Sequence, residues 1–306
     1  MLTSVRNFTL LLAIPLLTAC VSINSKLQLV SNAEAASSTT QSCDVEPVMD
    51  LPAEYTRGLD PEKISFLNWN IYKGNGENWQ QDLSSFAQSH DVMTIQEATL
   101  DEELTGLLET NDFTWVMNTA FHLNGTAAGV MTAANSIAVY SCGFKDQEPL
   151  LRIPKSTLVS YYKINGSEKK LLVANIHGIN FTFGVSNYHQ QLESLYAAIE
   201  HHDGPMIVAG DFNSWSDDRM AEVEQLVNRL KLSKIAYPVN NKTHVFGNAI
   251  DHVFYRDLEI VTNQVLQVSS SDHNPISVNF RFQPTVFSSV LPGKLYSSLN
   301  SATNRR

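Results

Sequence analysis

The sequence predicts an α/β fold in which two β-sheets pack together and helices cover their outer faces. Between residues 62 and 283, short β-branched or apolar runs alternate with stretches whose apolar residues recur at helical spacing. Predicted strands outnumber predicted helices, and several follow one another closely along the chain. A fully parallel sheet needs a long crossover after each strand, so two packed sheets fit this pattern better.

Nine segments have the composition of strands, and three have an apolar helical face. The predicted strands are 64–70, 92–96, 137–141, 157–163, 171–176, 206–210, 252–255, 264–268 and 276–282. The predicted helices run through 79–87, 188–199 and 220–230, where apolar residues recur three or four positions apart. The last begins at Ser216, followed by Asp217 and Asp218, which suits a capped helix N-terminus.

The first 20 residues have the features of an export signal. Arg6 precedes an apolar run at 8–17, which is too short to span a bilayer. The run ends at Leu17-Thr18-Ala19-Cys20, which resembles the bacterial lipobox and implies cleavage before a lipidated Cys20. Ordinary secretion with cleavage after 33–35 is the alternative. Because Val21 is not the aspartate that retains many lipoproteins in the inner membrane, we expect an outer-membrane lipoprotein facing the periplasm or cell surface.

The segments on either side of the predicted domain are polar. Residues 21–61 are rich in Ser, Thr, Asn and Ala and are predicted to be a flexible tether, and 284–306 form a polar C-terminal tail. Cleavage leaves two cysteines, Cys43 and Cys142, in a compartment where disulfides persist. The sequence does not decide between a bond that pins the tether to the domain and two separate thiols.

The charge of the chain disfavours non-specific binding to polyanions. The formal net charge is −10, and removal of residues 1–20, which contain one Arg and no acid, leaves −11. Proteins that hold duplex DNA by phosphate neutralisation are usually basic on the binding face. Small basic clusters, such as Arg152 with Lys155, are interpreted as solvated surface charge.

Five polar strings stand at the ends of predicted strands. They are Asn68-Trp69-Asn70, Gln96-Glu97, Gly210-Asp211-Phe212-Asn213, Asp251-His252 and Ser271-Asp272-His273-Asn274-Pro275. Each alone fits an ordinary turn, because Asp, Asn, Gly and Pro are common there. Together they supply carboxylates, amides and imidazole from independent loops, which is the composition of a metal-assisted hydrolase site. Within them, Trp69 and Phe212 are expected to be core residues.

The donor types favour a hard cation. Oxygen ligands from Asp, Asn and Glu suit Mg²⁺, with Mn²⁺ or Ca²⁺ as alternatives. The sequence has no thiolate cluster for zinc, and His177 and His273 lack the spacing of a zinc-binding helix. We therefore interpret both histidines as acid–base or phosphate-binding groups.

The ordered set of these residues resembles the endonuclease/exonuclease/phosphatase superfamily over about 62–283. The matching positions are Asn70, Glu97, His177, Asp211, Asn213, Asp251, Asp272 and His273. Further strings at 129–134, 150–156, 175–185 and 250–256 are similar to one bacterial branch, the YafD-like proteins. The resemblance implies a DNase-like, four-layer α/β sandwich of two packed mixed β-sheets flanked by helices, with the site at one end of the sheets.

The resemblance also implies a role for each matching position. Glu97 would be the principal metal ligand, with Asn70 beside it and Asp272 close to the metal or its water. Asp211 would orient or deprotonate the attacking water, and Asn213 would hold a phosphate oxygen. His273, oriented by Asp251, would contact the scissile phosphate. His177 would bind phosphate or help to protonate the leaving oxygen.

Three functions are compatible with these observations. The first is a metal-dependent phosphodiesterase, exported and endonuclease-like, acting as a monomer on nucleic acid. The second is a phosphatase or a phospholipase or sphingomyelinase-type hydrolase, acting on phospholipid or inositol phosphate near a membrane reached through the lipid anchor on Cys20. The third is a non-catalytic surface-binding lipoprotein, which has no need for the full set of site residues.

Overall fold

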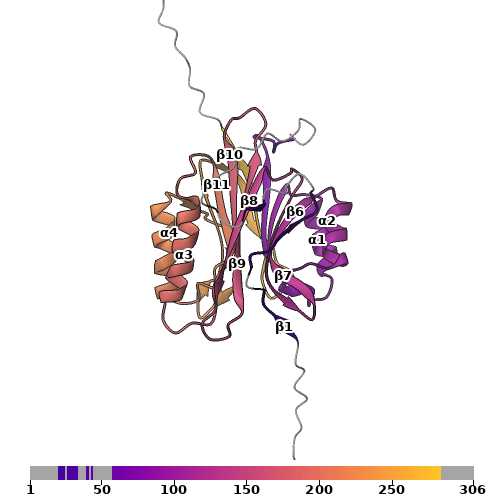
Figure 1. Ribbon diagram of the computed structural model, residues 1–306. Helices are drawn as coiled ribbons and strands as arrows, with labels where there is room; N and C mark the ends of the chain where they lie inside the picture. The colour runs from indigo at the N-terminus through magenta and orange to yellow at the C-terminus, as the bar shows by residue number, and fades with distance from the viewer. Residues whose placement is uncertain (1–19, 25, 34–38, 41–42, 44–56, 284–306) are drawn as a thin grey trace, which may run out of the picture.

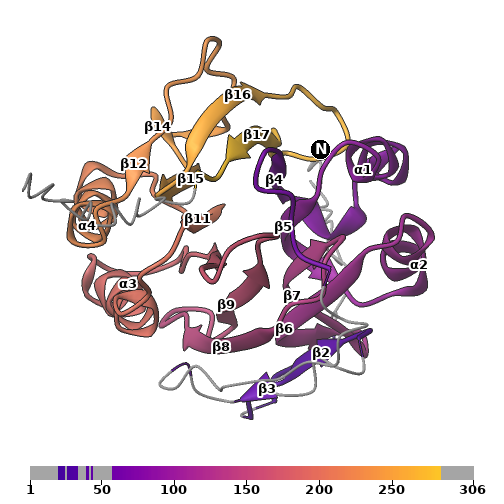
Figure 2. The ribbon, with the colours of Figure 1, turned by 90° about the horizontal axis from the view of Figure 1, so that it is seen from above.

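The chain folds into four layers in the order helices, sheet, sheet, helices (Figure 1). The computed structural model describes residues 20–24, 26–33, 39–40, 43 and 57–283. Seen from above, the two sheets lie face to face, with α1 and α2 outside one sheet and α3 and α4 outside the other (Figure 2). The predicted sandwich of two mixed sheets flanked by helices is therefore confirmed.

The first sheet contains eight strands, six of which are long. Its spatial order is β1-β6-β7-β5-β4-β17-β16, and β2 pairs with β6 outside this path. The pair β4 and β5 is parallel, and the other pairs are antiparallel. The strands are β1 (Val21–Ser22), β2 (Leu29–Ser31), β4 (Ile64–Asn70), β5 (Val92–Thr99), β6 (Thr114–Leu123), β7 (Thr126–Ala134), β16 (Glu259–Val265) and β17 (Ile276–Arg281).

The second sheet contains seven strands in the order β12-β15-β11-β10-β9-β8-β3. Its central pair, β10 and β11, is parallel. The strands are β3 (Thr39–Thr40), β8 (Tyr140–Gln147), β9 (Pro154–Lys163), β10 (Lys170–His177), β11 (Met206–Asp211), β12 (Ser233–Lys234) and β15 (Asp251–Arg256). A separate hairpin joins β13 (His244–Val245) to β14 (Asn248–Ala249).

Three apolar layers hold the four structural layers together. Ile64, Phe66 and Val173 belong to the core between the two sheets. A second core lies under α3 (Ser186–Ile199) and α4 (Asp217–Arg229), and a third lies under α1 (Trp79–Ala87) and α2 (Glu102–Thr110). Trp69 and Phe212 are buried in these layers as expected. No helix among the described residues is long and apolar enough to span a bilayer.

The described residues of the predicted tether pack against the domain. β1 and β2 pair with β6, whereas β3 pairs with β8 of the other sheet, so this segment crosses the edge of both sheets. Cys43 forms a disulfide with Cys142 on β8. The prediction of a flexible tether over 21–61 is wrong for these residues, because exposed sheet edges offer unpaired backbone groups to polar segments. The signal segment 1–19 and the tail 284–306 lie outside the described residues.

The sequence reading also missed one hairpin and one helix. β6 and β7 are joined at Asn124-Gly125, where both residues have positive φ, as a tight two-residue hairpin requires. Helix α2 is capped by Asp101, whose side chain accepts a hydrogen bond from the backbone N–H of Leu104. Two predicted strands are displaced by three residues: 137–141 overlaps the start of β8, and 264–268 overlaps the end of β16.

Candidate functional site

The predicted site residues lie at one end of the sandwich, where the two parallel strand pairs end. Asn70 is the last residue of β4, and Asp211 is the last residue of β11. His177 ends β10 and faces Asp211 in register, and Asp251 begins β15 as the other strand partner of Asp211. The register therefore places His177, Asp211 and Asp251 in a row across three adjacent strands, and all three are buried.

Asp211 connects the two sheets at this end. Asn70 Nδ2, from the first sheet, donates to Asp211 Oδ2 over 3.1 Å. The backbone N–H of Asn213 donates to Asp211 Oδ1 over 2.9 Å, and the Asn213 Nδ2 group lies 3.4 Å from Oδ2. The nearest imidazole nitrogens lie 3.5 Å (His177) and 4.0 Å (His273) from Oδ2. Burial raises the pKa of Asp211 to about 6, against the opposing effect of His273.

The turn after β11 depends on a glycine and an asparagine. A Cβ atom on Gly210 would lie 1.9 Å from the backbone oxygen of Ile176, so only glycine allows β10 and β11 to approach this closely. Asn213 has φ 49°, a left-handed conformation that asparagine tolerates better than most residues. Its Nδ2 donates to Gly178 O over 3.0 Å, which holds the turn against the end of β10.

His273 and Asp251 form a buried pair. The distance from His273 Nδ1 to Asp251 Oδ2 is 2.8 Å, so Nδ1 donates to the carboxylate and Nε2 is left to face the site. The backbone of His273 is fixed by Trp69, whose Nε1 donates to His273 O, and by the Ser271 hydroxyl, which accepts from His273 N. Burial alone lowers the pKa of His273, but the carboxylates around it, chiefly Asp251, raise it to about 10. The imidazole is therefore a cation at neutral pH.

A β-bulge turns Glu97 toward the same end. The register between β5 and β7 shifts between Ile95 and Ala98, and Glu97 has φ 53°. Gln96 points into the sandwich instead, where its Nε2 donates to Asn175 Oδ1 of the second sheet over 2.8 Å. The Glu97 carboxylate forms an ion pair with Lys73 and lies 4.0 Å from His177 Nε2.

Lys155 belongs to the site, although the sequence analysis interpreted it as surface charge. Its Nζ lies 2.9 Å from His177 Nε2. Burial, together with the nearby charges of Lys155, His273 and Lys73, lowers the pKa of His177 well below its usual value. His177 is therefore neutral, and its Nε2 accepts a hydrogen bond from the Lys155 ammonium. The charged donor on this side of the site is Lys155.

A hollow of about 250 Å³ opens beside these groups. Its polar lining includes Lys73, Glu97, Lys155 and His177, and its apolar lining includes Phe181. The buried carboxylate of Glu148 also lines it and accepts a hydrogen bond from the backbone N–H of Asn180 over 2.8 Å. Glu148 and Lys73 were not singled out from the sequence.

The predicted metal ligands occupy adjoining segments at the rim. Asn70 and Glu97 come from the parallel strands β4 and β5, and Asp272 is half exposed, with Oδ1 3.9 Å from His273 Nε2. The Ser271 hydroxyl donates to Asn70 O and so ties the segment containing Asp272 to the end of β4. These donors are all oxygen atoms, which fits a hard cation such as Mg²⁺. Such a cation would compete with the Lys73 ammonium for Glu97.

A second, tighter cluster of possible metal ligands contains a histidine as well as carboxylates. Among the described residues, Asp211, Asp251 and His273 place one ligand atom each within 4.8 Å of one another. A protonated imidazole has no lone pair to offer a metal, and His273 is held in that form by the two carboxylates. We therefore interpret this cluster as a charge-coupled acid–base group beside the predicted metal ligands.

Comparison with known proteins gives the family and the fold. The model of the Endonuclease/Exonuclease/phosphatase family matches residues 67–273. A UPF0294 protein of Vibrio campbellii is 39% identical over 221 residues, which cover 71% of this chain and 77% of that protein. A UPF0294 protein of Photorhabdus laumondii is 37% identical over 218 residues, covering 71% and 84%.

Three solved structures are similar to this chain in fold. The catalytic domain of human Nocturnin, with a bound sulfate anion, has a TM-score of 0.56 at 17% identity and covers 74% of this chain and 97% of that chain. A mannosyl-6-phosphatase of Bacteroides thetaiotaomicron has a TM-score of 0.54 at 17% identity, covering 72% and 100%. TDP2 of D. rerio, complexed with a single-strand DNA product, has a TM-score of 0.52 at 18% identity, covering 72% and 99%.

Proposed function

Because the chain belongs to the endonuclease/exonuclease/phosphatase family, we propose that it is a metal-dependent phosphodiester hydrolase that works at the end of the sandwich around Asp211. One observation carries the proposal. A buried carboxylate with its pKa raised to about 6 lies 4.0 Å from an imidazole that a second carboxylate keeps charged. Both pKa values are raised, so Asp211 becomes a base that titrates near neutral pH beside an imidazole that stays charged, and displaced pairs of this kind are typical of acid–base sites.

Each group has a role that its geometry supports. Asp211 accepts the proton of the attacking water. Its pKa of about 6 lets the carboxylate gain and lose a proton near physiological pH. His273 donates from Nε2 to a phosphoryl oxygen and stabilises its growing negative charge, while Asp251 fixes the ring. Asn213 positions a phosphate oxygen, and Lys155 supplies a positive charge beside neutral His177, near the leaving oxygen.

The metal site belongs to the same proposal. Asn70, Glu97 and Asp272 would hold Mg²⁺, with Mn²⁺ or Ca²⁺ as alternatives, through oxygen donors alone. The bound cation would neutralise the phosphoryl oxygens and stabilise the leaving alkoxide. We also propose that the chain is exported, is lipidated at Cys20 and works as a monomer.

Nucleic acid is one candidate substrate for this chemistry. The similarity in fold to a protein complexed with single-strand DNA product favours it, whereas the formal net charge of −10 does not. The similarity to a mannosyl-6-phosphatase favours small phosphoesters. A phospholipid headgroup is a third candidate, because it is joined through a phosphodiester linkage, as nucleotides are in nucleic acid.

The test is hydrolysis of a substrate panel by the full chain. Bis(p-nitrophenyl) phosphate, plasmid DNA, RNA, phospholipid vesicles and inositol phosphates are each incubated with Mg²⁺, Mn²⁺ or Ca²⁺, and with EDTA. We expect turnover of at least one phosphodiester that EDTA abolishes. His273→Ala should remove it, and His201→Ala, at a side chain that is 93% exposed, should leave it unchanged. Absence of turnover with every metal would contradict the proposal.

A further inference from the structure

The N-terminal end of the described chain is fixed to a specific hairpin. Cys20 N donates to Asn124 Oδ1 over 3.1 Å, and Asn124 N donates to Cys20 O over 2.9 Å. The next two residues pair with the end of β6, with Val21 opposite Leu123. Cys20 is therefore held at the turn between β6 and β7.

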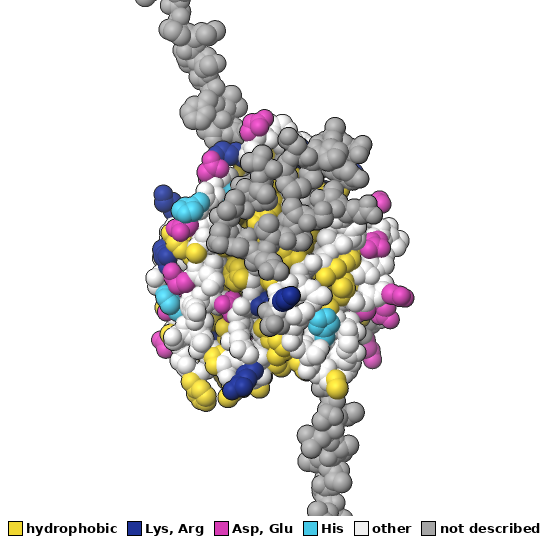
Figure 3. All heavy atoms as spheres, in the orientation of Figure 1, with side chains coloured by type: hydrophobic (Ala, Val, Ile, Leu, Met, Phe, Trp, Pro, Cys, Tyr) yellow, Lys and Arg dark blue, Asp and Glu magenta, His cyan; other side chains and the backbone are white. Residues whose placement is uncertain are grey.

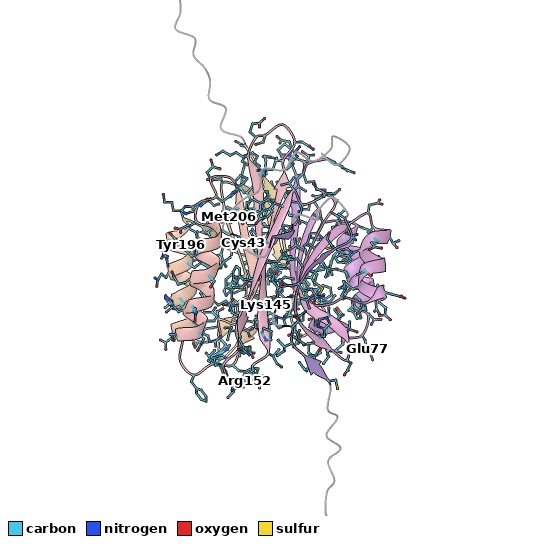
Figure 4. The ribbon with its side chains drawn as sticks, in the orientation of Figure 1. Cys43, Glu77, Lys145, Arg152, Tyr196 and Met206 are labelled. Carbon is cyan, nitrogen blue, oxygen red and sulfur yellow. A yellow bond between two sulfur atoms is a disulfide. The ribbon has the colours of Figure 1, made fainter. Side chains whose placement is uncertain are left out.

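This turn lies at the same end of the sandwich as the candidate site. Phe121 on β6 and Ala128 on β7 line the hollow that also contains Glu97 and His177. Ala128 pairs with the last residue of β5, two positions beyond Glu97. In Figure 1 β1 lies at the lower end of the molecule, and Figure 4 labels Arg152, from the turn between β8 and β9, at that same end.

Large apolar side chains are exposed around this end. Figure 3 shows hydrophobic side chains at the lower edge of the molecule, with a basic side chain among them. Ten large hydrophobic residues are exposed among the described residues, and six of them lie in loops that follow or adjoin the site strands. These six are Tyr72, Leu150, Leu151, Phe181, Phe183 and Phe246.

The two most exposed of these residues lie in loops next to the site strands. Phe183 is 87% exposed and follows the end of β10 by six residues. Phe246 is 86% exposed at the tip of the β13–β14 hairpin, and its ring lies 6.0 Å from that of Trp215. Trp215 Nε1 donates to Asn180 Oδ1, and Asn180 lines the hollow. Phe246 is thus linked through Trp215 to the lining of the hollow, and Phe183 lies in the same loop as Phe181, which also lines it.

The N-terminal segment attached to this end of the molecule indicates which partner the exposed apolar surface contacts. The chain before Cys20 carries the apolar run at 8–17, and Cys20 is the cysteine of the lipobox-like string. Lipidation of Cys20 would bring a lipid bilayer to the turn between β6 and β7. Apolar side chains near a bilayer surface insert into its interfacial region, and a neighbouring cation such as Arg152 attracts anionic headgroups.

We propose that the end of the sandwich bearing the site docks on a lipid bilayer, and that the substrate is a phospholipid headgroup phosphodiester at its surface. The substrate part rests on the proposed hydrolytic function, whereas the docking part rests on the proposed lipid anchor at Cys20 and not on the hydrolysis. The N-terminal attachment and the exposed phenylalanines hold the opening of the hollow against the headgroup layer. A diester at that surface reaches the groups around Asp211 without leaving the bilayer.

Docking is tested with the full, anchored chain in vesicles of phosphatidylethanolamine and phosphatidylglycerol. An environment-sensitive fluorophore is attached to a cysteine introduced as Phe183→Cys, Phe246→Cys or, as the control, Val261→Cys. Val261 is 48% exposed on β16, where its neighbours pair with Phe280 and Asn279, opposite the start of β4 and thus far from the site. We expect a lipid-borne quencher to reduce emission at 183 and 246 severalfold more than at 261. Equal quenching at all three positions would overturn the docking.

The substrate is tested with Phe183→Ser/Phe246→Ser, two changes at exposed side chains outside the catalytic groups. Headgroup release from the vesicles should fall by about tenfold or more, because two apolar side chains no longer insert. Hydrolysis of soluble bis(p-nitrophenyl) phosphate should stay unchanged, as it should in Val261→Ser. Turnover of the soluble diester without headgroup release by the wild type would overturn the lipid substrate and leave the proposed function intact. Absence of turnover of both with every metal would contradict the proposed function, and the quenching result would still decide the docking.

Discussion

Replacing Asp251 with asparagine removes the carboxylate that keeps His273 charged. The pKa of His273 rises from 6.5 to about 10 although burial opposes it, which corresponds to about 5 kcal/mol in favour of the imidazolium. Three carboxylates raise this pKa, and Asp251 is both the nearest and the strongest of them. It therefore supplies at least a third of the effect, or about 2 kcal/mol, so its removal lowers the pKa of the ring by about 1.5 or more.

We expect Asp251→Asn to lower kcat/KM for bis(p-nitrophenyl) phosphate at least about tenfold at pH 10, where about half of the wild-type imidazole but only a few per cent of the variant imidazole is charged. The ratio of variant to wild-type activity should recover as the pH falls toward 5.5, because acid recharges the imidazole. The ratio is the informative quantity, since protonation of Asp211 near pH 6 lowers the activity of both proteins as the pH falls. Asp203→Asn, at a side chain that is 82% exposed, is the control.

Titration of the His273 ring by NMR separates this explanation from a folding defect. The pKa of the ring should fall in Asp251→Asn while the remaining spectrum stays that of the folded protein. Activity within threefold of the wild type, or a deficit that does not change with pH, would refute the assigned role of the pair.

Three further predictions follow from the contacts described above. Lys155→Met should reduce kcat about a hundredfold, because it removes a charged donor to a developing oxyanion. It should also raise the pKa of His177 in NMR titrations, because the charge of Lys155 lowers that pKa. A wild-type rate would exclude Lys155 from the site. Burial raises the pKa of Asp146 from 3.8 to about 6, so the folded state binds the carboxyl proton more tightly than the unfolded state, and stability declines as the pH rises through that interval. Asp146→Asn should therefore raise the free energy of unfolding, measured by urea denaturation, by up to about 3 kcal/mol at pH 7.5 and not at pH 3. An equal gain at both pH values would disprove the burial argument. Cys43→Ser opens a bridge with a sequence separation of 99 to Cys142 and should cost up to about 5 kcal/mol in the chain-entropy account; an unchanged melting temperature would mean that the bridge does not stabilise the fold.

Several strands were predictable because burial on both faces leaves runs rich in apolar and β-branched residues. β4 was predicted with its observed bounds, 64–70, and every residue in it is buried. The hairpin of β6 and β7 was missed, although Asn124-Gly125 is the dipeptide that a tight hairpin favours. The segment with β1 and β3 could not be predicted from local pattern, because its two-residue strands form only where the sheets offer an edge.

The site was predictable where its residues end strands. Asn70, His177 and Asp211 all do so, and strand register alone brings the last two together. The direction of Glu97 depends on a bulge, which the run of apolar residues before it does not reveal. Lys155 escaped notice because lysine is ordinarily a surface residue, and only the fold places its ammonium against His177.

The most direct test of the account is the rate of bis(p-nitrophenyl) phosphate hydrolysis as Mg²⁺ is returned to EDTA-treated protein. The wild type should be inactive without metal and should regain activity in a saturable manner. Glu97→Gln should need a much higher Mg²⁺ concentration for half-maximal rate, because it removes the charge of the principal proposed ligand. Metal-independent turnover, or the same Mg²⁺ dependence in Glu97→Gln, would contradict the central claim that metal-assisted phosphodiester hydrolysis takes place at this end of the sandwich.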